Sequence, residues 1–229
     1  MKKIMLLACV CAIALATSQS FAADSRTDMV KRLNASSQVI QDIQSIPAKA
    51  IPDWLVAKAT CVAVVPSYKK AAFIVGATYG QGVVTCRTAS GWSAPAFIQL
   101  TGGSFGFQAG GQSTDLVLVA TNQGGMQSLL KSKFKIGGDA AASAGPVGRN
   151  AAADTNLYMK SELLTYSRSQ GLFAGIDLNG TVVHQNTDNT RGFYGKDVSF
   201  DSILDGQEPT PPDARAFVST VAKYFRSTK

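Results

Sequence analysis

The sequence predicts an α+β fold, in which a single β-rich domain of antiparallel hairpins, barrel-like or a sandwich, has an N-terminal and a C-terminal helix packed on it. Apolar residues recur at helical spacing near both ends of the chain. Between them, short runs rich in β-branched and aromatic residues are separated by Gly, Pro, Ser and Asn, the pattern of successive hairpins. The 229 residues, less an expected leader, fit one domain with a real core.

The leader is expected at residues 1–22. Lys2 and Lys3 precede an apolar run over residues 4–16, and Ser20-Phe21-Ala22 has small residues where a signal peptidase reads. The run is shorter than the about 20 residues that span a bilayer, so we expect a cleaved leader and not an anchor. Cleavage is expected after Ala22, or equally one residue to either side, with a domain over residues 23–229.

An alternative leader ends at Cys9, where Leu6-Leu7-Ala8-Cys9 resembles a lipoprotein signal. Only the five residues 4–8 would then separate the lysines from the cysteine, short for a hydrophobic core of about 7–15 residues. No later segment is long and apolar enough to be a transmembrane helix. We therefore expect a soluble product, periplasmic or secreted.

Removing residues 1–22 takes two lysines from the 22 basic residues, which leaves 20 against 15 acidic ones and a net charge of +5. Nucleic-acid binding is disfavoured by the exported location. Only Cys61 and Cys86 follow the leader, and two cysteines in an oxidising compartment indicate a disulfide; two buried free thiols are the alternative. The disulfide would close a loop of about 25 residues and stabilise the fold by about 3 kcal/mol.

Helices are expected at residues 25–43, with an apolar stripe of Met29, Leu33, Ile40 and Ile43, and after Pro52 through Ala57. The stripe lacks the bulky aromatics of interfacial helices, so we expect it to pack in the core. A final helix at about residues 211–227 follows a linker, and the domain core covers about residues 47–206. The strands expected before residue 122 are Cys61–Pro66, Ala71–Tyr79, Gly82–Arg87, Trp92–Leu100, Ser104–Gly110 and Asp115–Thr121.

Later strands are expected at Leu163–Ser167 and Leu172–Val183, the second with an Asn179-Gly180 hairpin turn. The segment Leu129–Ile136 carries Lys131, Lys133 and Lys135 at a spacing of two. On a strand these lysines share one face, and Phe134 and Ile136 can be buried on the other.

Catalytic signals are weak. Gly102-Gly103-Ser104-Phe105-Gly106 matches the hydrolase pattern G-x-S-x-G, but the glycines that follow oppose the helix that this motif requires. His184, which would have to act as the base, is predicted in a solvated loop. Phosphate-loop and zinc or calcium patterns are absent from the sequence, so we expect neither a cofactor nor a metal.

A long ordered series of motifs resembles the SYLF domain family. It covers nearly the whole predicted mature chain: Ile51-Pro52, Cys61–Pro66, Lys69–Phe73, Gly80–Arg87, Gly91–Pro95, Thr101–Gly106, Gln112–Leu118, Ala144–Arg149 and Tyr166–Gly175. The resemblance implies lipid binding without catalysis, since eukaryotic members bind phosphoinositide membranes and a yeast member binds and bundles actin. Without an SH3 or FYVE module in this sequence, a cytoskeletal role is not expected. The expected partner is an anionic phospholipid or another envelope lipid.

The residue pattern supports the same class, because each Lys or Arg near an anionic membrane contributes about 1 kcal/mol. The candidate lipid-binding residues are Lys69, Lys70, Lys131, Lys133, Lys135 and Arg149. They could equally be solubilising charges or guards of an edge strand. Two further functions stay open: a structural or protein-interaction role in the envelope, and a serine hydrolase using Ser104.

Overall fold

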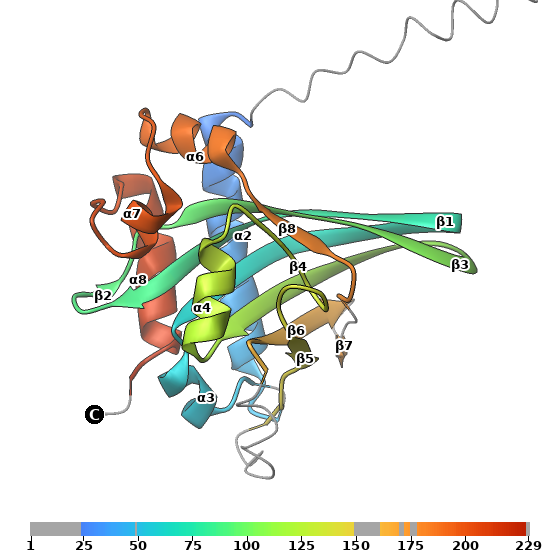
Figure 1. Ribbon diagram of the computed structural model, residues 1–229. Coiled ribbons are helices and arrows are strands. Elements are labelled where there is room, and N and C mark those ends of the chain that lie inside the picture. The colour runs from blue at the N-terminus through green and yellow to red at the C-terminus, as the bar shows by residue number, and fades with distance from the viewer. Residues whose placement is uncertain (1–23, 49, 149–160, 170–171, 175–177, 228–229) are drawn as a thin grey trace, which may run out of the picture.

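Two long antiparallel strands, β1 (Cys61–Thr88) and β3 (Ala96–Ala120), form the centre of the structure, a computed structural model (Figure 1). It describes residues 24–48, 50–148, 161–169, 172–174 and 178–227, with the backbone alone at 72–75, 104–110, 169 and 172–174. The eight-stranded mixed sheet curls into a half-barrel with helices at both ends of the chain, so the α+β prediction is confirmed.

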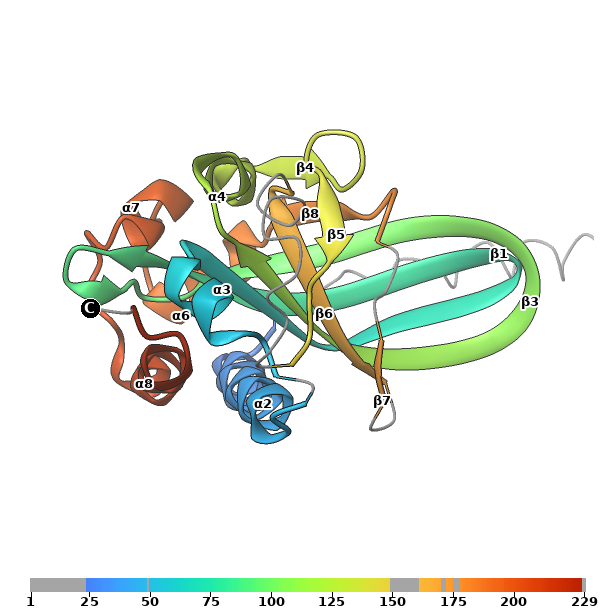
Figure 2. The ribbon, with the colours of Figure 1, turned by 90° about the horizontal axis from the view of Figure 1, so that it is seen from below.

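The two strands pair along their length, from Cys61 opposite Ala120 to Val84 opposite Ala96. A turn through β2 (Gly91–Trp92), which pairs with the end of β1, joins them. We call this pair of strands the ribbon. Figure 2 shows that the ribbon folds back on itself, so that each strand has two arms joined by a bend.

Contacts between the two arms of β1 show where the bend lies. Cys61 and Cys86 are joined by a disulfide with 2.05 Å between the sulfur atoms. A Cβ on Gly82 would lie 2.3 Å from the Val64 oxygen, so the arms approach closely where glycine leaves room. Each of these contacts joins residues placed nearly symmetrically about residues 73–74. The bend therefore comprises residues 72–75 of β1 and, opposite them, 104–110 of β3.

The prediction of six separate short strands before residue 122 is wrong, because most of these residues lie in two continuous strands, β1 and β3. Pro66 and Ser67 form a bulge in a continuous strand, where Ser67 has φ 55° and its N–H bonds the Asp115 carboxylate at 2.9 Å. The glycines after residue 75 permit bending and close approach, and they do not end the strand. Gly and Pro therefore mark irregularities within two strands, where the sequence alone suggested turns between hairpins.

The remaining strands extend the ribbon on both sides. One arm of β3 pairs with β6, which also pairs with β5 and β7, and the other arm pairs with β8, which pairs with β4. Their bounds are β4 (Lys133–Lys135), β5 (Ala142–Ala144), β6 (Leu163–Ser169), β7 (Leu172–Ala174) and β8 (Val182–Gln185). The Asn179-Gly180 turn is confirmed by a 2.8 Å bond from the Thr181 N–H to the Leu178 oxygen. The hairpin is wrong, because β7 and β8 pair with different strands.

The predicted helices are confirmed as α2 (Arg26–Ser45), α3 (Asp53–Lys58), a 3₁₀ turn η1 (Pro212–Ala214) and α8 (Arg215–Tyr224). Ser25 caps α2, accepting a hydrogen bond from the Asp28 N–H. The apolar stripe of α2 is buried in the core as expected. The short helices α4 (Gln123–Leu130), α6 (Thr187–Tyr194) and α7 (Phe200–Leu204) were not predicted; each has a polar Asn or Ser N-cap but too few turns to show periodicity. None of the helices in the described ranges is both long and apolar enough to cross a membrane.

Strand alternation divides the apolar residues of the sheet between two cores. Val62 and Val64 of β1 join the core covered by α2, α3 and α8, whereas Ala63 and Val65 join the core covered by α4 and α7. In Figure 2 α2 and α8 lie on one side of the ribbon, and α4 and α7 lie on the other. Most of the helices gather around the end of the ribbon that carries the disulfide.

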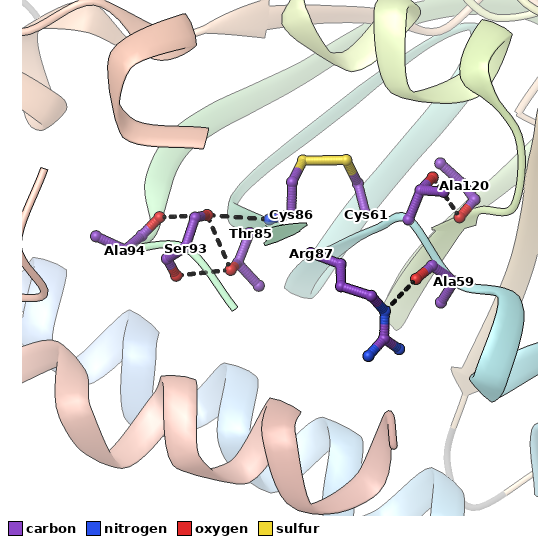
Figure 3. The surroundings of a disulfide bond; sticks show 9 residues. Ala59, Cys61, Thr85, Cys86, Arg87, Ser93, Ala94 and Ala120 are labelled. Carbon is purple, nitrogen blue, oxygen red and sulfur yellow. Dashed lines mark hydrogen bonds between the residues drawn. A yellow bond between two sulfur atoms is a disulfide. The ribbon is translucent and has the colours of Figure 1, made fainter. Parts of the chain in front are cut away.

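Figure 3 shows how the disulfide end is held. The Cys86 N–H donates to the Ser93 hydroxyl at 3.0 Å, and the Arg87 N–H donates to the Thr60 oxygen at 2.7 Å. The Arg87 guanidinium donates to the oxygens of Ala59 and Phe225, both at 3.0 Å, and lies 4.6 Å from the centre of the Trp92 ring. This one side chain therefore ties β1 to the ends of α3 and α8.

Candidate functional site

The lysines of the segment 131–135 lie on the surface, in two different elements. Lys133 and Lys135 are exposed on β4. The side chains of Phe134 and Ile136 are each only 1% exposed, so the predicted alternation is confirmed. Lys131 is exposed too, but it is the C-cap of α4 and does not belong to the strand. We call Lys131, Lys133 and Lys135 the β4 lysines.

The β4 lysines have little acidic compensation. Among the described residues, none of the three forms an ion pair. The nearby Asp139 carboxylate is used locally, because it accepts the Lys135 backbone N–H at 2.7 Å. In the described sheet β4 pairs only with β8, so it is an edge strand with the lysines on its outward face.

His184 lies opposite Lys133 in the β4–β8 pair, and not in the solvated loop that the sequence suggested. Its Nε2 atom shares a hydrogen bond with the Thr101 hydroxyl at 3.1 Å. Burial, together with the neighbouring Lys133 charge, lowers the pKa of His184 below its ordinary value. The ring is therefore neutral near pH 7 and adds no charge to the lysine surface.

Lys69 and Lys70 form a second exposed pair, on the arm of β1 that leads to the bend. They lie opposite Ser113 and Gln112 in the ribbon, so their cross-strand neighbours are uncharged. β1 and β4 do not pair, and the lysine candidates therefore fall into two groups on different strands. Arg149, the sixth candidate, lies outside the described residues.

The hydrolase alternative lacks the local structure that it requires. Ser104 occupies a position within β3, opposite Gly76 of β1, and the strand continues to Ala120. A nucleophile elbow needs a helix directly after the serine, because the strained strand-to-helix turn is what exposes the hydroxyl. Within the described residues, no group of three or more His, Cys, Asp or Glu side chains is placed to hold a metal ion.

A polar cluster that the sequence did not reveal fixes the start of the described chain. The Arg32 guanidinium, in a side chain only 11% exposed, pairs with the Asp24 carboxylate at 2.6 Å and also bonds Gln81 of β1. Asn189 of α6 bonds Asp24 twice, at 2.7 and 3.1 Å. Burial alone would raise the pKa of Asp24, but the bonds from Arg32 and Asn189 hold it below its ordinary value. This cluster is structural, and only the arrangement of α2, α6 and β1 brings it together.

Comparison with known proteins identifies a consistent set of relatives. A family model described as "Ysc84: Las17-binding protein actin regulator" matches residues 101–224. The chain is 36% identical over 170 residues to "SH3 domain-containing YSC84-like protein 1" of Rattus norvegicus and 35% identical over 170 residues to that of Homo sapiens, in each case 73% of this chain. "Protein YSC84" of Saccharomyces cerevisiae is 32% identical over 170 residues, 72% of this chain.

The matches cover only part of these relatives. They span 50% of the rat protein, 49% of the human protein and 36% of the yeast protein. The chain therefore spans about half the length of these animal relatives and a smaller share of the yeast relative. The range matched by the family model, residues 101–224, includes most of β3, the β4 lysines and α8. The family description names an actin regulator, and the animal relatives are named as SH3 domain-containing proteins.

Proposed function

We propose that this chain, which belongs to the Ysc84 (SYLF) family, is an exported, non-catalytic module that binds an anionic lipid surface through its exposed lysines. The observation that carries the proposal is the outward face of β4. Two of its three residues are exposed lysines without an ion pair to any described residue, and Lys131 continues the charge at the end of α4. Phe134 between them is buried, so the strand holds the charges on a rigid support.

The energy available suits a reversible surface contact. Three lysines near an anionic membrane contribute about 3 kcal/mol, on the order of a hundredfold in partitioning. Lys69 and Lys70 would add about 2 kcal/mol if both groups engage the same surface. This attraction is screened by salt, because the Debye length falls from about 10 Å at 0.1 M to about 3 Å at 1 M.

Export is supported by the leader pattern of residues 1–22 and by the pairing of Cys61 with Cys86. Disulfides persist in oxidising compartments such as the bacterial periplasm. In that setting the available partners are anionic phospholipids or other envelope lipids, and a phosphoinositide is not required.

A second candidate function is protein binding. The family is described as Las17-binding, and β4 has an edge on which an extended peptide could add as a further strand. In this case the lysines of β4 protect the edge against aggregation. A protein partner in the envelope would then take the place of the lipid.

Vesicle flotation with the purified, processed protein separates these functions. We expect binding to vesicles that contain phosphatidylglycerol, no binding to pure phosphatidylcholine, and weakening as salt increases. Replacing the β4 lysines with glutamine should reduce binding about a hundredfold and flatten its salt dependence, because about 3 kcal/mol of attraction is removed.

The matched control replaces Lys31, Lys58 and Lys223, exposed lysines of α2, α3 and α8, with glutamine. It makes the same change in net charge at other positions and should retain most of the binding. Equal loss in both triple variants would show that only net charge matters. Undiminished binding by the β4 variant would reduce these lysines to edge protection, and no vesicle binding by the wild-type protein would favour a protein partner.

A further inference from the structure

One face of the sheet is left uncovered by the described part of the chain, where β1, β3, β8 and β4 run side by side. The register gives a row of directly opposite residues across these four strands: Tyr79, Thr101, Val182 and Lys135. Directly opposite residues of a sheet point to the same face. Tyr79 is 39% exposed, Lys135 is exposed, and the two residues between them are half-buried. The row therefore faces solvent from the edge strand β4 to the ribbon.

The neighbouring rows define the extent of this face. The next row consists of residues buried on the opposite side: Gly80, Leu100, Val183 and Phe134. The row after it points outward again: Gln81, Gln99, His184 and Lys133. Farther along the ribbon the outward face is covered, because Val83 and Phe97 belong to the core under α2, α3 and α8. In the other direction it continues with the exposed pair Ala77 and Gly103. We call this pair and the two outward rows the open face.

The open face carries cations and an aromatic ring but no acid. Residues 54–114 contain no Asp or Glu, and neither do β8 and β4. The Asp24 carboxylate, whose charge acts on Tyr79 from outside the open face, is paired with Arg32 at 2.6 Å. Burial, together with Asp24, raises the pKa of Tyr79, so its hydroxyl is uncharged at neutral pH. Negative charge on a partner would therefore meet attraction from the lysines and no opposing acid of the open face.

This composition fits the boundary of an anionic bilayer. Tyrosine is favoured there, because its ring is apolar and its hydroxyl is polar. Lys133 and Lys135 project on the same side as Tyr79, and their flexible side chains can extend toward headgroup phosphates. The side chains of Gln99 and Thr101, between the ring and the lysines, are uncharged and able to hydrogen-bond to headgroups. The open face is therefore complementary to a surface that is both anionic and amphipathic.

The dimensions of the open face allow all of these side chains to touch one surface. Three strand spacings of about 4.8 Å separate β1 from β4, so Tyr79 and Lys135 lie about 14 Å apart across the sheet. Neighbouring strands are rotated by about 20–25°, which twists the open face. The lysines at its edge are long and flexible enough to follow that twist. The contact is therefore broad and shallow.

We propose that the open face is the side of the protein that lies against an anionic bilayer, with Tyr79 at the headgroup boundary and Lys133 and Lys135 at the edge of the contact. The proposal rests on the proposed function and deepens it. Charged lysines on an edge strand are compatible with many orientations of the protein on the bilayer, whereas the open face specifies one. The orientation and the lysine contact are separable by experiment.

Charge substitutions on the open face test the orientation. In the processed protein, Ala77→Glu should weaken binding to phosphatidylglycerol vesicles about fivefold, and Ala77→Lys should strengthen it about fivefold, because each changes the attraction by one charge near the membrane. Ala222 provides matched controls, since it is exposed on α8, which lies at the β2 end of the ribbon (Figure 2). Ala77 lies ten residues before Arg87, the partner of Trp92 in β2, or about 33 Å along the strand.

The control variants are Ala222→Glu and Ala222→Lys, which make the same changes in net charge. They should alter binding less than about twofold, because the Debye length is only about 10 Å at 0.1 M salt. The melting temperatures of both Ala77 variants should equal that of the wild type, since the replaced side chain is exposed. Equal effects at the two positions would show that net charge alone matters, and would overturn the orientation.

A tryptophan probe tests the contact at Tyr79 itself. Tyr79→Trp is compared with Ile46→Trp, because the replaced side chains are similarly exposed, at 39% and 41%. Tyr79 is close to Asp24, which precedes α2, whereas Ile46 follows α2, a helix of 20 residues and so about 30 Å long. After subtraction of the wild-type signal from Trp54 and Trp92, anionic vesicles should shift the Tyr79→Trp probe to shorter wavelength and protect it from the soluble quencher acrylamide. The Ile46→Trp probe should show neither effect.

The outcomes separate the two proposals. If the wild-type protein floats with anionic vesicles and the β4 lysine variant floats less, but the Ala77 variants bind normally and the Tyr79→Trp probe stays accessible, the orientation is wrong and the lysine contact stands. If the wild-type protein does not bind, both proposals fail. A shift of the Tyr79→Trp probe that depends on protein concentration without vesicles would assign the open face to contact with a second copy of the chain, and would also overturn the orientation.

Discussion

The two ends of the β1–β3 ribbon consist of the same two strands but are held in opposite ways. At one end, the disulfide between Cys61 and Cys86, the Arg87 guanidinium and the helices α2, α3 and α8 fix both arms. At the other end, the bend has no helix over it and lies beyond the last described core residues. The comparison indicates that the described contacts that stabilise the ribbon are concentrated at the disulfide end.

The largest effect on stability should come from the disulfide. Replacing Cys61 and Cys86 together with alanine should lower the free energy of unfolding by about 3 kcal/mol, because the 25-residue separation no longer restricts the unfolded chain. Denaturant unfolding under non-reducing conditions measures this loss of free energy. The wild-type protein unfolded in the presence of a reductant should show a similar loss. A change within about 0.5 kcal/mol would contradict the idea that this end carries the stability.

A pair of glycines gives a sharper test of the same comparison. Gly82→Ala places a Cβ 2.3 Å from the Val64 oxygen, so the arms must separate, at a cost of about 1–3 kcal/mol. Gly111→Ala, on the arm of β3 near the bend, meets nothing within 4 Å and should be neutral or slightly stabilising. The melting temperatures of the two variants, compared with that of the wild type, measure the difference. Equal destabilisation would mean that the two ends are packed alike.

The smallest effect on stability is expected beside the bend. Lys69→Gln with Lys70→Gln should change the free energy of unfolding by less than about 0.5 kcal/mol, because both side chains are exposed without an ion pair to a described residue. The same variant should bind anionic vesicles more weakly than Lys31→Gln with Lys223→Gln, which has equal charge. A folded variant with unaltered binding would remove these lysines from the lipid contact.

Features that depend on interactions within one segment could be predicted from the sequence, whereas features that depend on contacts between distant segments could not. The helices α2 and α8 and the burial of Phe134 and Ile136 were predicted because periodicity within one segment determines them. The disulfide pairing was expected from the number of cysteines after the predicted leader and from the oxidising compartment that the leader implies. The length of β1 and β3 was not predicted, because glycine permits a turn and a close approach equally well.

The candidate site shows the same limit. Alternation along the chain was enough to place Lys133 and Lys135 on the surface, but the short helix α4, which ends just before Lys131, has too few residues to show a period. The separation of the two lysine groups depends on the order of strands in the sheet, which local sequence does not encode. The absence of acidic residues from 54–114 is a sequence signal that could have drawn attention to the ribbon earlier.

Both cysteines belong to one strand, and this has a consequence for the order of events in folding. The β1–β3 ladder can grow outward from the turn near β2 without the two sulfur atoms meeting, because pairing with β3 leaves β1 free to remain extended. The sulfur atoms come together only when the paired ribbon doubles back. Disulfide formation therefore requires the ribbon to fold back on itself, and pairing of β1 with β3 alone is not sufficient. In a chain whose two strands are already paired, oxidation of the two cysteines covalently fixes the folded-back ribbon.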